Sequence, residues 1–148
     1  MITINVDKQI LIHSKKIYSI STAKKGVGEI YGSNCTPRGK FIISEKIGAN
    51  LELGSVLVGR KYTGEIYSTG LSKVYPNRDW ILSRIIWLDG VEEFNKNTKN
   101  RLIYIHGSPD EIPMGVPGSK GCIRMRNVDV IELFEQIMIF EKIHIIES

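Results

Sequence analysis

The chain has 148 residues, 42% of them hydrophobic and 24% charged, and its 20 basic and 16 acidic side chains give a net charge of +4. This length suits a single domain over residues 1–148, and no segment approaches the roughly 20 apolar residues of a membrane span. The basic residues are dispersed, which argues against nucleic acid as a partner. No secretory signal is visible at the first residues, which lack a basic flank and an apolar stretch.

Short runs rich in β-branched residues recur along the chain, with Gly, Pro, Asn and Asp between them. They predict strands at residues 2–6, 10–13, 17–22, 41–44, 55–58, 81–88, 102–106 and 142–147. Many short strands without alternating helices favour a mainly β fold, either a sandwich or a barrel of mixed strands.

One main helix is predicted over residues 127–139, with Asn127 as its N-cap. Val128, Ile131, Phe134 and Ile137 recur at every third position, so they are expected to form its buried face. A short helical turn is expected over residues 91–97. The polar and aromatic segment 71–80 is a candidate wall or flap over a cleft.

The most informative residue is Cys122, in the segment Ser-Lys-Gly-Cys-Ile-Arg-Met at 119–125. Gly118 and Gly121 precede it, whereas an inert core cysteine normally sits within an apolar strand or helix. A turn of small residues exposes the sulfur and leaves backbone N–H groups free to hold an oxyanion. Cys122 is therefore a candidate nucleophile, with a structural cysteine as the alternative.

A cysteine nucleophile needs a base, and His106 is the candidate. It ends the apolar run 102–105 and precedes Gly107, whereas His13 and His144 lie within strand-like runs where an exposed or half-buried structural histidine is usual. Residues 108–118 contain three of the five prolines. Their fixed φ lowers the entropy cost of carrying Cys122 back toward His106; a plain surface connection is the alternative.

The other cysteine, Cys35, lies in a polar turn without a nearby histidine in sequence. We interpret it as a free, nonessential thiol. A disulfide between Cys35 and Cys122 is the alternative, and it would mask the nucleophile.

These motifs closely resemble the L,D-transpeptidase catalytic domain (YkuD-type), whose hallmark is His-Gly, a loop, and Ser/Thr-x-Gly-Cys followed by an apolar residue and Arg or Asn. The resemblance covers most of the chain, because it extends to Ser21-Thr22-Ala23, Gly26-x-Gly28, Thr36-Pro37-x-Gly39-x-Phe41 and Asn127-x-Asp129. It implies a β-sandwich or barrel with the main helix directly after the cysteine loop.

The resemblance also implies roles. The carbonyl of Gly107 would orient the imidazole of His106, so no carboxylate is required and Asp110 and Glu111 are interpreted as solvated acids. Ser119 would shape the turn by a hydroxyl hydrogen bond, and backbone N–H groups from Lys120 to Cys122 would hold the oxyanion. Lys120 departs from the histidine of many members.

Arg124 can bind a carboxylate in bidentate fashion, so it is expected to fix the substrate or the loop, a surface ion pair being the alternative. Tyr104, two residues before His106, is a second substrate-binding candidate.

The activity implied is that of a peptidoglycan L,D-transpeptidase. Cys122 would attack the carbonyl of the third stem-peptide residue, release the terminal D-amino acid, and pass the acyl group from the thioester to an amine, giving a 3→3 cross-link; carbapenems would acylate the same thiol. The expected partners are peptidoglycan stem peptides, the expected location is the cell envelope or periplasm, and a monomer is expected. The scattered cysteines and histidines predict no metal, and no cofactor is implied.

Three alternatives to transpeptidation stay open. Water as the acceptor would make the protein an L,D-carboxypeptidase. Another cysteine amidase could use the same Cys122 and His106 on a different amide. A noncatalytic cell-wall-binding module could retain the fold without the activity.

Overall fold

Ten strands, two α-helices and one 3₁₀-helix make up the computed structural model, which describes residues 1–148. In chain order these are β1 (Ile2–Asn5), β2 (Ile10–His13), β3 (Lys16–Ser21), β4 (Gly39–Ile47), β5 (Ser55–Val58), β6 (Lys61–Ile66), α1 (Thr69–Val74), β7 (Ile81–Gly90), η1 (Glu93–Asn95), β8 (Tyr104–Ser108), β9 (Ile123–Arg126), α2 (Asn127–Gln136) and β10 (Lys142–Ile146). None of the helices has the length and apolar character needed to cross a membrane.

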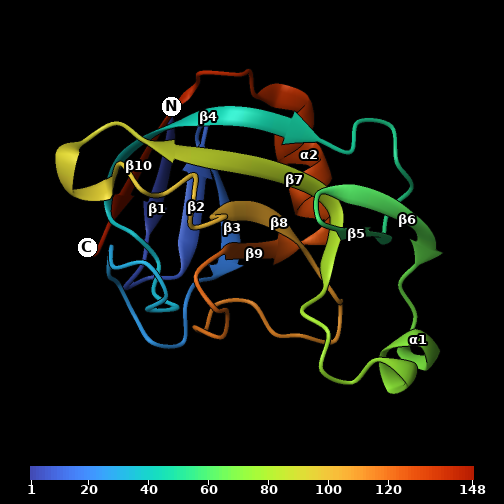
Figure 1. The fold of residues 1–148 in the computed structure, drawn as a ribbon. Coiled ribbons are helices and arrows are strands. Elements are labelled where there is room, and N and C mark those ends of the chain that lie inside the picture. Colours follow the sequence, from blue (N-terminus) through green and yellow to red (C-terminus); the bar gives the residue numbers. More distant parts are fainter.

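The strands form one sheet that closes on itself. Its order is β4-β10-β1-β2-β3-β9-β8-β7-β5-β6, and a further pairing of β4 with β7 joins the first eight strands of this series into a ring. The pairs β1–β10 and β8–β9 are parallel, and the others are antiparallel. The β5–β6 hairpin continues from the first residues of β7 and extends beyond the ring (Figure 1). The predicted mainly β barrel or sandwich of mixed strands is confirmed.

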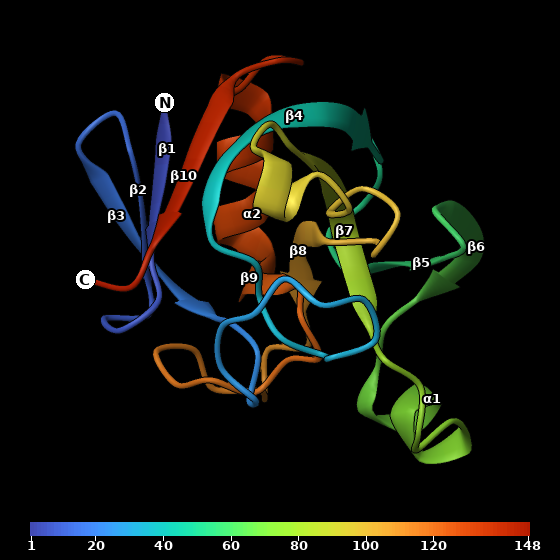
Figure 2. The same cartoon turned by 60° about the vertical axis from the view of Figure 1, so that its left-hand side comes forward.

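Helix α2 follows β9 without a loop and lies between the layer of β1, β2, β3 and β10 and the layer of β7 and β8 (Figure 2). Val130, Leu133 and Phe134 are buried in the 19-residue core, together with Ile137 just beyond the helix. This confirms one main helix after the cysteine loop.

Three details of the predicted helix are wrong. The N-cap position is Arg126, and Asn127 is the first helical residue with its side chain buried in the protein. Of the predicted stripe, Phe134 and Ile137 are buried and Ile131 packs against the core, but Val128 is 61% exposed. The helix also ends earlier than predicted, at Gln136. The direct connection to β9 fixes the direction in which the helix leaves the sheet, and with it the rotation of the helix about its own axis. The spacing of apolar residues does not reveal this rotation.

Three elements were not predicted. β9 is only four residues long, β6 has no buried residue, and α1 has none either. Elements without a buried face carry no apolar periodicity, so the sequence gives little sign of them. The expected helical turn over residues 91–97 is a 3₁₀-helix at Glu93–Asn95.

Candidate active site

The parallel strands β8 and β9 bring the predicted site residues to one side of the barrel wall. In their register Ile105 lies beside Ile123, and His106 lies beside Arg124. Successive side chains of a strand point to opposite faces, and Ile105 and Ile123 enter the large core. His106 and Arg124 therefore share the other face. Cys122, immediately before β9, packs into a separate small cluster there.

The imidazole of His106 is fixed by its own main chain. The ring is 1% exposed, and Nδ1 lies 2.7 Å from the carbonyl oxygen of Gly107. A carbonyl can only accept, so Nδ1 carries the hydrogen and Nε2 has a free lone pair. Burial lowers the pKa of His106, against the smaller opposing effect of the Gly107 hydrogen bond. The ring is therefore neutral near neutral pH and can accept a proton at Nε2.

Only glycine fits at position 107. A Cβ atom there would lie 2.4 Å from Oδ1 of Asn127 and 2.5 Å from the carbonyl oxygen of Leu82, both closer than van der Waals contact allows. The close approach of these groups fixes the peptide whose carbonyl holds the imidazole. Close packing thus requires a glycine at this position of the His-Gly motif, independently of the hydrogen bond that its carbonyl accepts.

The sulfur of Cys122 lies against the main chain of the segment before His106. The N–H of Tyr104 donates to Sγ at 3.3 Å, and the thiol donates to the carbonyl oxygen of Leu102 at 3.4 Å. No hydrogen bond joins the sulfur to the imidazole of His106 in this structure. The two groups share a face of neighbouring strands, and the thiol hydrogen is directed elsewhere.

The charges around the sulfur act in both directions. Burial raises the pKa of the Cys122 thiol to about 12, and the negative charge of Asp79 adds to this. The Tyr104 N–H and the positive charges of Arg124 and Arg101 act in the opposite direction. The thiol is therefore protonated near neutral pH, and a base must remove its proton when it reacts.

The turn before Cys122 is held by the hydroxyl of Ser119. This hydroxyl donates to the carbonyl oxygen of Cys122 and accepts from the N–H of Gly121 at 3.2 Å. Gly121 has a φ of +127°, and a Cβ atom there would press against Cys35 and Ile103. The N–H groups of Lys120 and Cys122 donate to no group of the protein.

Residues far upstream attach this turn to the barrel. The carbonyl of Thr22 accepts from the N–H groups of Gly118 and Ser119, at 2.8 and 2.9 Å. The hydroxyl of Thr36 donates to the carbonyl of Gly121 at 2.9 Å and accepts from the N–H of Ala23 at 3.0 Å. The upstream part of the sequence resemblance is thus in direct contact with the nucleophile turn.

Arg124 joins two segments at the edge of the site. Its guanidinium donates to the carbonyl of Gly118 at 3.1 Å and to the carboxylate of Asp79 at 3.2 Å. The guanidinium therefore holds the proline-rich loop, one of the two roles expected for it. Asp79 ends the segment 71–80, expected as a wall or flap, and nothing in the sequence indicated that it would pair with Arg124.

Tyr104 presents its main chain, not its ring, to the sulfur. The ring is 5% exposed and packs edge to face on Trp87 with centroids 5.6 Å apart. Its hydroxyl accepts from Arg60 at 3.2 Å. The side chain expected to bind substrate is therefore occupied by contacts within the protein.

Asn127 is a positioning residue that we expected only as a helix cap. Its Nδ2 donates to the carbonyl of Ser108 at 2.9 Å and to Asp110 at 3.2 Å, and its Oδ1 accepts from the hydroxyl of Ser83 at 2.7 Å. It thereby ties the end of β8 to β7. Asp110, expected to be solvated, is exposed yet takes part in this contact. The only signal for Asn127 was its place in the resemblance.

The remaining expectations concern Cys35 and Glu111. Cys35 and Cys122 are both free thiols, so the alternative disulfide is wrong. Cys35 contributes its carbonyl oxygen to Arg101 at 2.7 Å. Glu111, expected to be solvated, is exposed and accepts from the hydroxyl of Tyr67 at 2.6 Å.

Comparisons with known proteins give a family match and a similarity of fold. The family model of the L,D-transpeptidase catalytic domain (YkuD) matches residues 1–145. No curated protein matches the chain.

Three solved structures illustrate the similarity of fold. An L,D-transpeptidase from Xylanimonas cellulosilytica has a TM-score of 0.61 at 20% identity, covering 98% of this chain and 59% of that one. An L,D-transpeptidase from Mycobacterium smegmatis has a TM-score of 0.59 at 17% identity, and the match covers 98% of this chain and 57% of that one. L,D-transpeptidase 3 from Mycobacterium tuberculosis, solved with a faropenem-derived adduct, has a TM-score of 0.58 at 12% identity. That match covers 99% of this chain and 59% of that one. The chain thus spans less than two thirds of the length of each.

Proposed function

Because the chain belongs to the L,D-transpeptidase catalytic domain (YkuD) family, we propose that it is a peptidoglycan L,D-transpeptidase that acts through a thioester on Cys122. The observation that carries this proposal is the hydrogen bond between Nδ1 of His106 and the Gly107 carbonyl. It leaves Nε2 of a neutral imidazole as a proton acceptor on the face where Cys122 lies. The substrate is a stem peptide of the cell wall, so the protein works in the cell envelope.

Acylation begins with a stem peptide whose third-residue carbonyl approaches Sγ. Nε2 of His106 takes the thiol proton as the sulfur turns from the Leu102 carbonyl toward the substrate. Sγ attacks the carbonyl carbon, and the N–H groups of Lys120 and Cys122, which have no partner in the protein, stabilise the oxyanion. The imidazolium then gives its proton to the leaving amine, and the terminal D-amino acid departs.

Deacylation uses the same groups in the reverse order. An amine of a second stem peptide attacks the thioester carbonyl, Nε2 of His106 takes its proton, and the thiol is regenerated as the 3→3 amide forms. Both groups are neutral at rest, so general-base activation on substrate arrival fits better than a preformed thiolate and imidazolium pair.

The test is a mass-spectrometric assay on a disaccharide-tetrapeptide. We expect the wild-type protein and Cys35→Ala to remove the terminal D-alanine and to form cross-linked dimers, and Cys122→Ala to do neither. A carbapenem should form one covalent adduct on the first two proteins and none on Cys122→Ala. Free tripeptide without dimers would indicate a carboxypeptidase. An adduct that persists in Cys122→Ala would refute the assigned nucleophile.

A further inference from the structure

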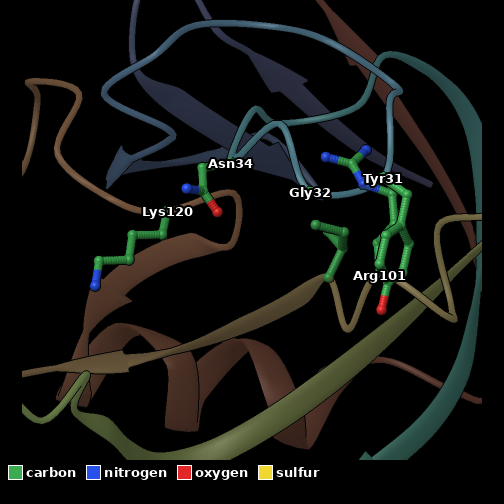
Figure 3. Close-up of a pocket in the computed structure, with 6 residues that line it drawn as sticks. Tyr31, Gly32, Asn34, Arg101 and Lys120 are labelled. Atoms are coloured by element: carbon green, nitrogen blue, oxygen red, sulfur yellow. The ribbon is translucent and has the colours of Figure 1, made fainter.

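A small pocket with a volume of about 190 Å³ opens beside the nucleophile turn. Three segments that are distant in sequence form it (Figure 3): the loop before β4, the segment before β8, and the turn before Cys122. The lining residues are Tyr31, Gly32, Asn34, Arg101, Ile103 and Lys120. None of them was assigned to substrate recognition from the sequence.

Two of the segments that form this pocket also adjoin the nucleophile. Leu102, before β8, and Tyr104, its first residue, contact Sγ through their main chain. The residues alternating with them, Arg101 and Ile103, line the pocket. On the other side Lys120 is two residues before Cys122. The positive charge of Arg101 acts on the Cys122 thiol, so a group bound to Arg101 lies within electrostatic reach of the sulfur.

The pocket is cationic and has no acidic residue in its lining. The guanidinium of Arg101 donates only to neutral acceptors, the carbonyl oxygens of Gly28 and Cys35 and the hydroxyl of Ser33. Lys120 makes no ion pair and no side-chain hydrogen bond. By contrast, the guanidinium of Arg124 has a carboxylate partner within the protein.

Arg101 is partly buried, and withdrawing a guanidinium from water without a carboxylate partner is costly. Desolvation accordingly lowers the pKa of Arg101, and its electrostatic interactions with Cys35, Glu29 and Cys122 oppose this only in part. Glu29 itself is paired with Arg38. A ligand carboxylate in the pocket would supply the missing counter-charge.

We propose that this pocket binds a carboxylate on the side chain of the third stem-peptide residue and so selects acyl donors that carry one. This inference rests on the proposed function, because it presumes that the carbonyl attacked by Cys122 belongs to that residue. A side chain leaves the backbone next to its own carbonyl, which matches a pocket whose charge reaches the sulfur. Arg101 supplies charge within the pocket. Lys120 lines the opposite side, and its amino group extends away from Arg101, so its charge acts from the rim (Figure 3).

The leaving residue also has a carboxylate, so the experiment must separate the two sources. It uses Cys122→Ala, which cannot turn over, and three synthetic tetrapeptides titrated by calorimetry. The first has a diamino acid with a side-chain carboxylate at the third position, the second has the matching side-chain carboxamide, and the third has an amide in place of the terminal carboxylate only. We expect the first and third to bind about tenfold more tightly than the second at low salt.

Lys120→Gln, added to Cys122→Ala, tests the pocket without breaking the contacts that Arg101 makes to the loop. It should reduce the preference for the carboxylate about threefold, as removal of a partly solvated charge does. Lys61→Gln removes the same charge from exposed β6 and should leave the preference unchanged.

Equal binding of the acid and the carboxamide would overturn the pocket assignment. So would a preference that follows the terminal carboxylate, or a loss of preference in Lys61→Gln as large as that in Lys120→Gln. Turnover by the wild-type protein separates this from the proposed function. Release of D-alanine from the acid and the carboxamide at equal rates would refute the pocket alone. No turnover and no binding with any peptide would refute both.

Discussion

His106 and Cys122 lie on neighbouring strands, yet they are positioned in different ways. The imidazole is held by the carbonyl of the next residue, within a regular strand. The sulfur follows a turn that is fixed by Thr22 and Thr36. Both contacts are distant in sequence; Thr36 and Gly121, for example, are 85 residues apart. The hydrogen bond that orients the base thus joins adjacent residues, whereas the hydrogen bonds that hold the nucleophile turn join residues that meet only in the folded barrel.

This difference has a consequence for substitutions. A change near His106 acts on the chemistry directly, because the proton acceptor and its orienting carbonyl are adjacent in the chain. The turn before Cys122 can be disturbed from a distance without touching either reacting group. Three predictions break or sharpen the contrast.

The largest effect is expected from His106→Gln, which removes the proton acceptor. The rate constant for release of D-alanine should fall about 10³-fold, the usual size of a general-base contribution. The matched control is His144→Gln on half-buried β10, which should keep wild-type activity. A loss of less than tenfold in His106→Gln, with circular dichroism unchanged, would mean that another group takes the thiol proton.

An intermediate effect is expected from Thr36→Val, which retains the shape of the side chain and removes its hydroxyl. The Ala23 N–H and the Gly121 carbonyl would lose a partner in a buried site, so the free energy of unfolding should fall by about 1–3 kcal/mol. Displacement of the turn should also lower kcat by up to about 10²-fold. Denaturant unfolding and steady-state kinetics measure the two effects.

The control for Thr36→Val is Thr63→Val in exposed β6, where water can replace the lost hydroxyl. Its unfolding free energy should change by less than about 1 kcal/mol. Unchanged kcat in a folded Thr36→Val protein would show that the distant contacts stabilise the barrel without positioning the sulfur.

The smallest effect concerns the pH dependence of kcat/KM. His106 must be neutral to act, and because burial lowers its pKa, activity should persist below the ordinary titration range of histidine. Asp79 raises this pKa and Arg124 lowers it. Asp79→Asn should therefore move the acid limb to lower pH, and Arg124→Gln should move it to higher pH, each by roughly half a unit at low salt.

The two variants serve as controls for each other, because both break the same ion pair. A structural effect of that pair would move the two profiles in the same direction. Opposite shifts would identify the charges themselves as the cause. Identical profiles for all three proteins would place the acid limb on another group.

Much of the fold and site could be predicted from sequence because the signals are local. The apolar runs indicated most strands, and the fold class and the family are confirmed. Cys122 and His106 stood out because glycines lie next to both reactive side chains, and Gly107 gained its role through the resemblance. The structure brings these residues to neighbouring strands, and their catalytic roles remain predictions.

The tertiary structure alone decided what fixes the site and what surrounds it. Asn127 proved to tie β8 to β7 instead of capping the helix, and Val128 proved to be exposed, because the exit direction of β9 sets the rotation of α2. Asp79 and Arg101 gave no signal because single charged residues in polar segments are indistinguishable from solvated ones. Their neighbours come from distant parts of the chain, and only closure of the barrel brings those parts together.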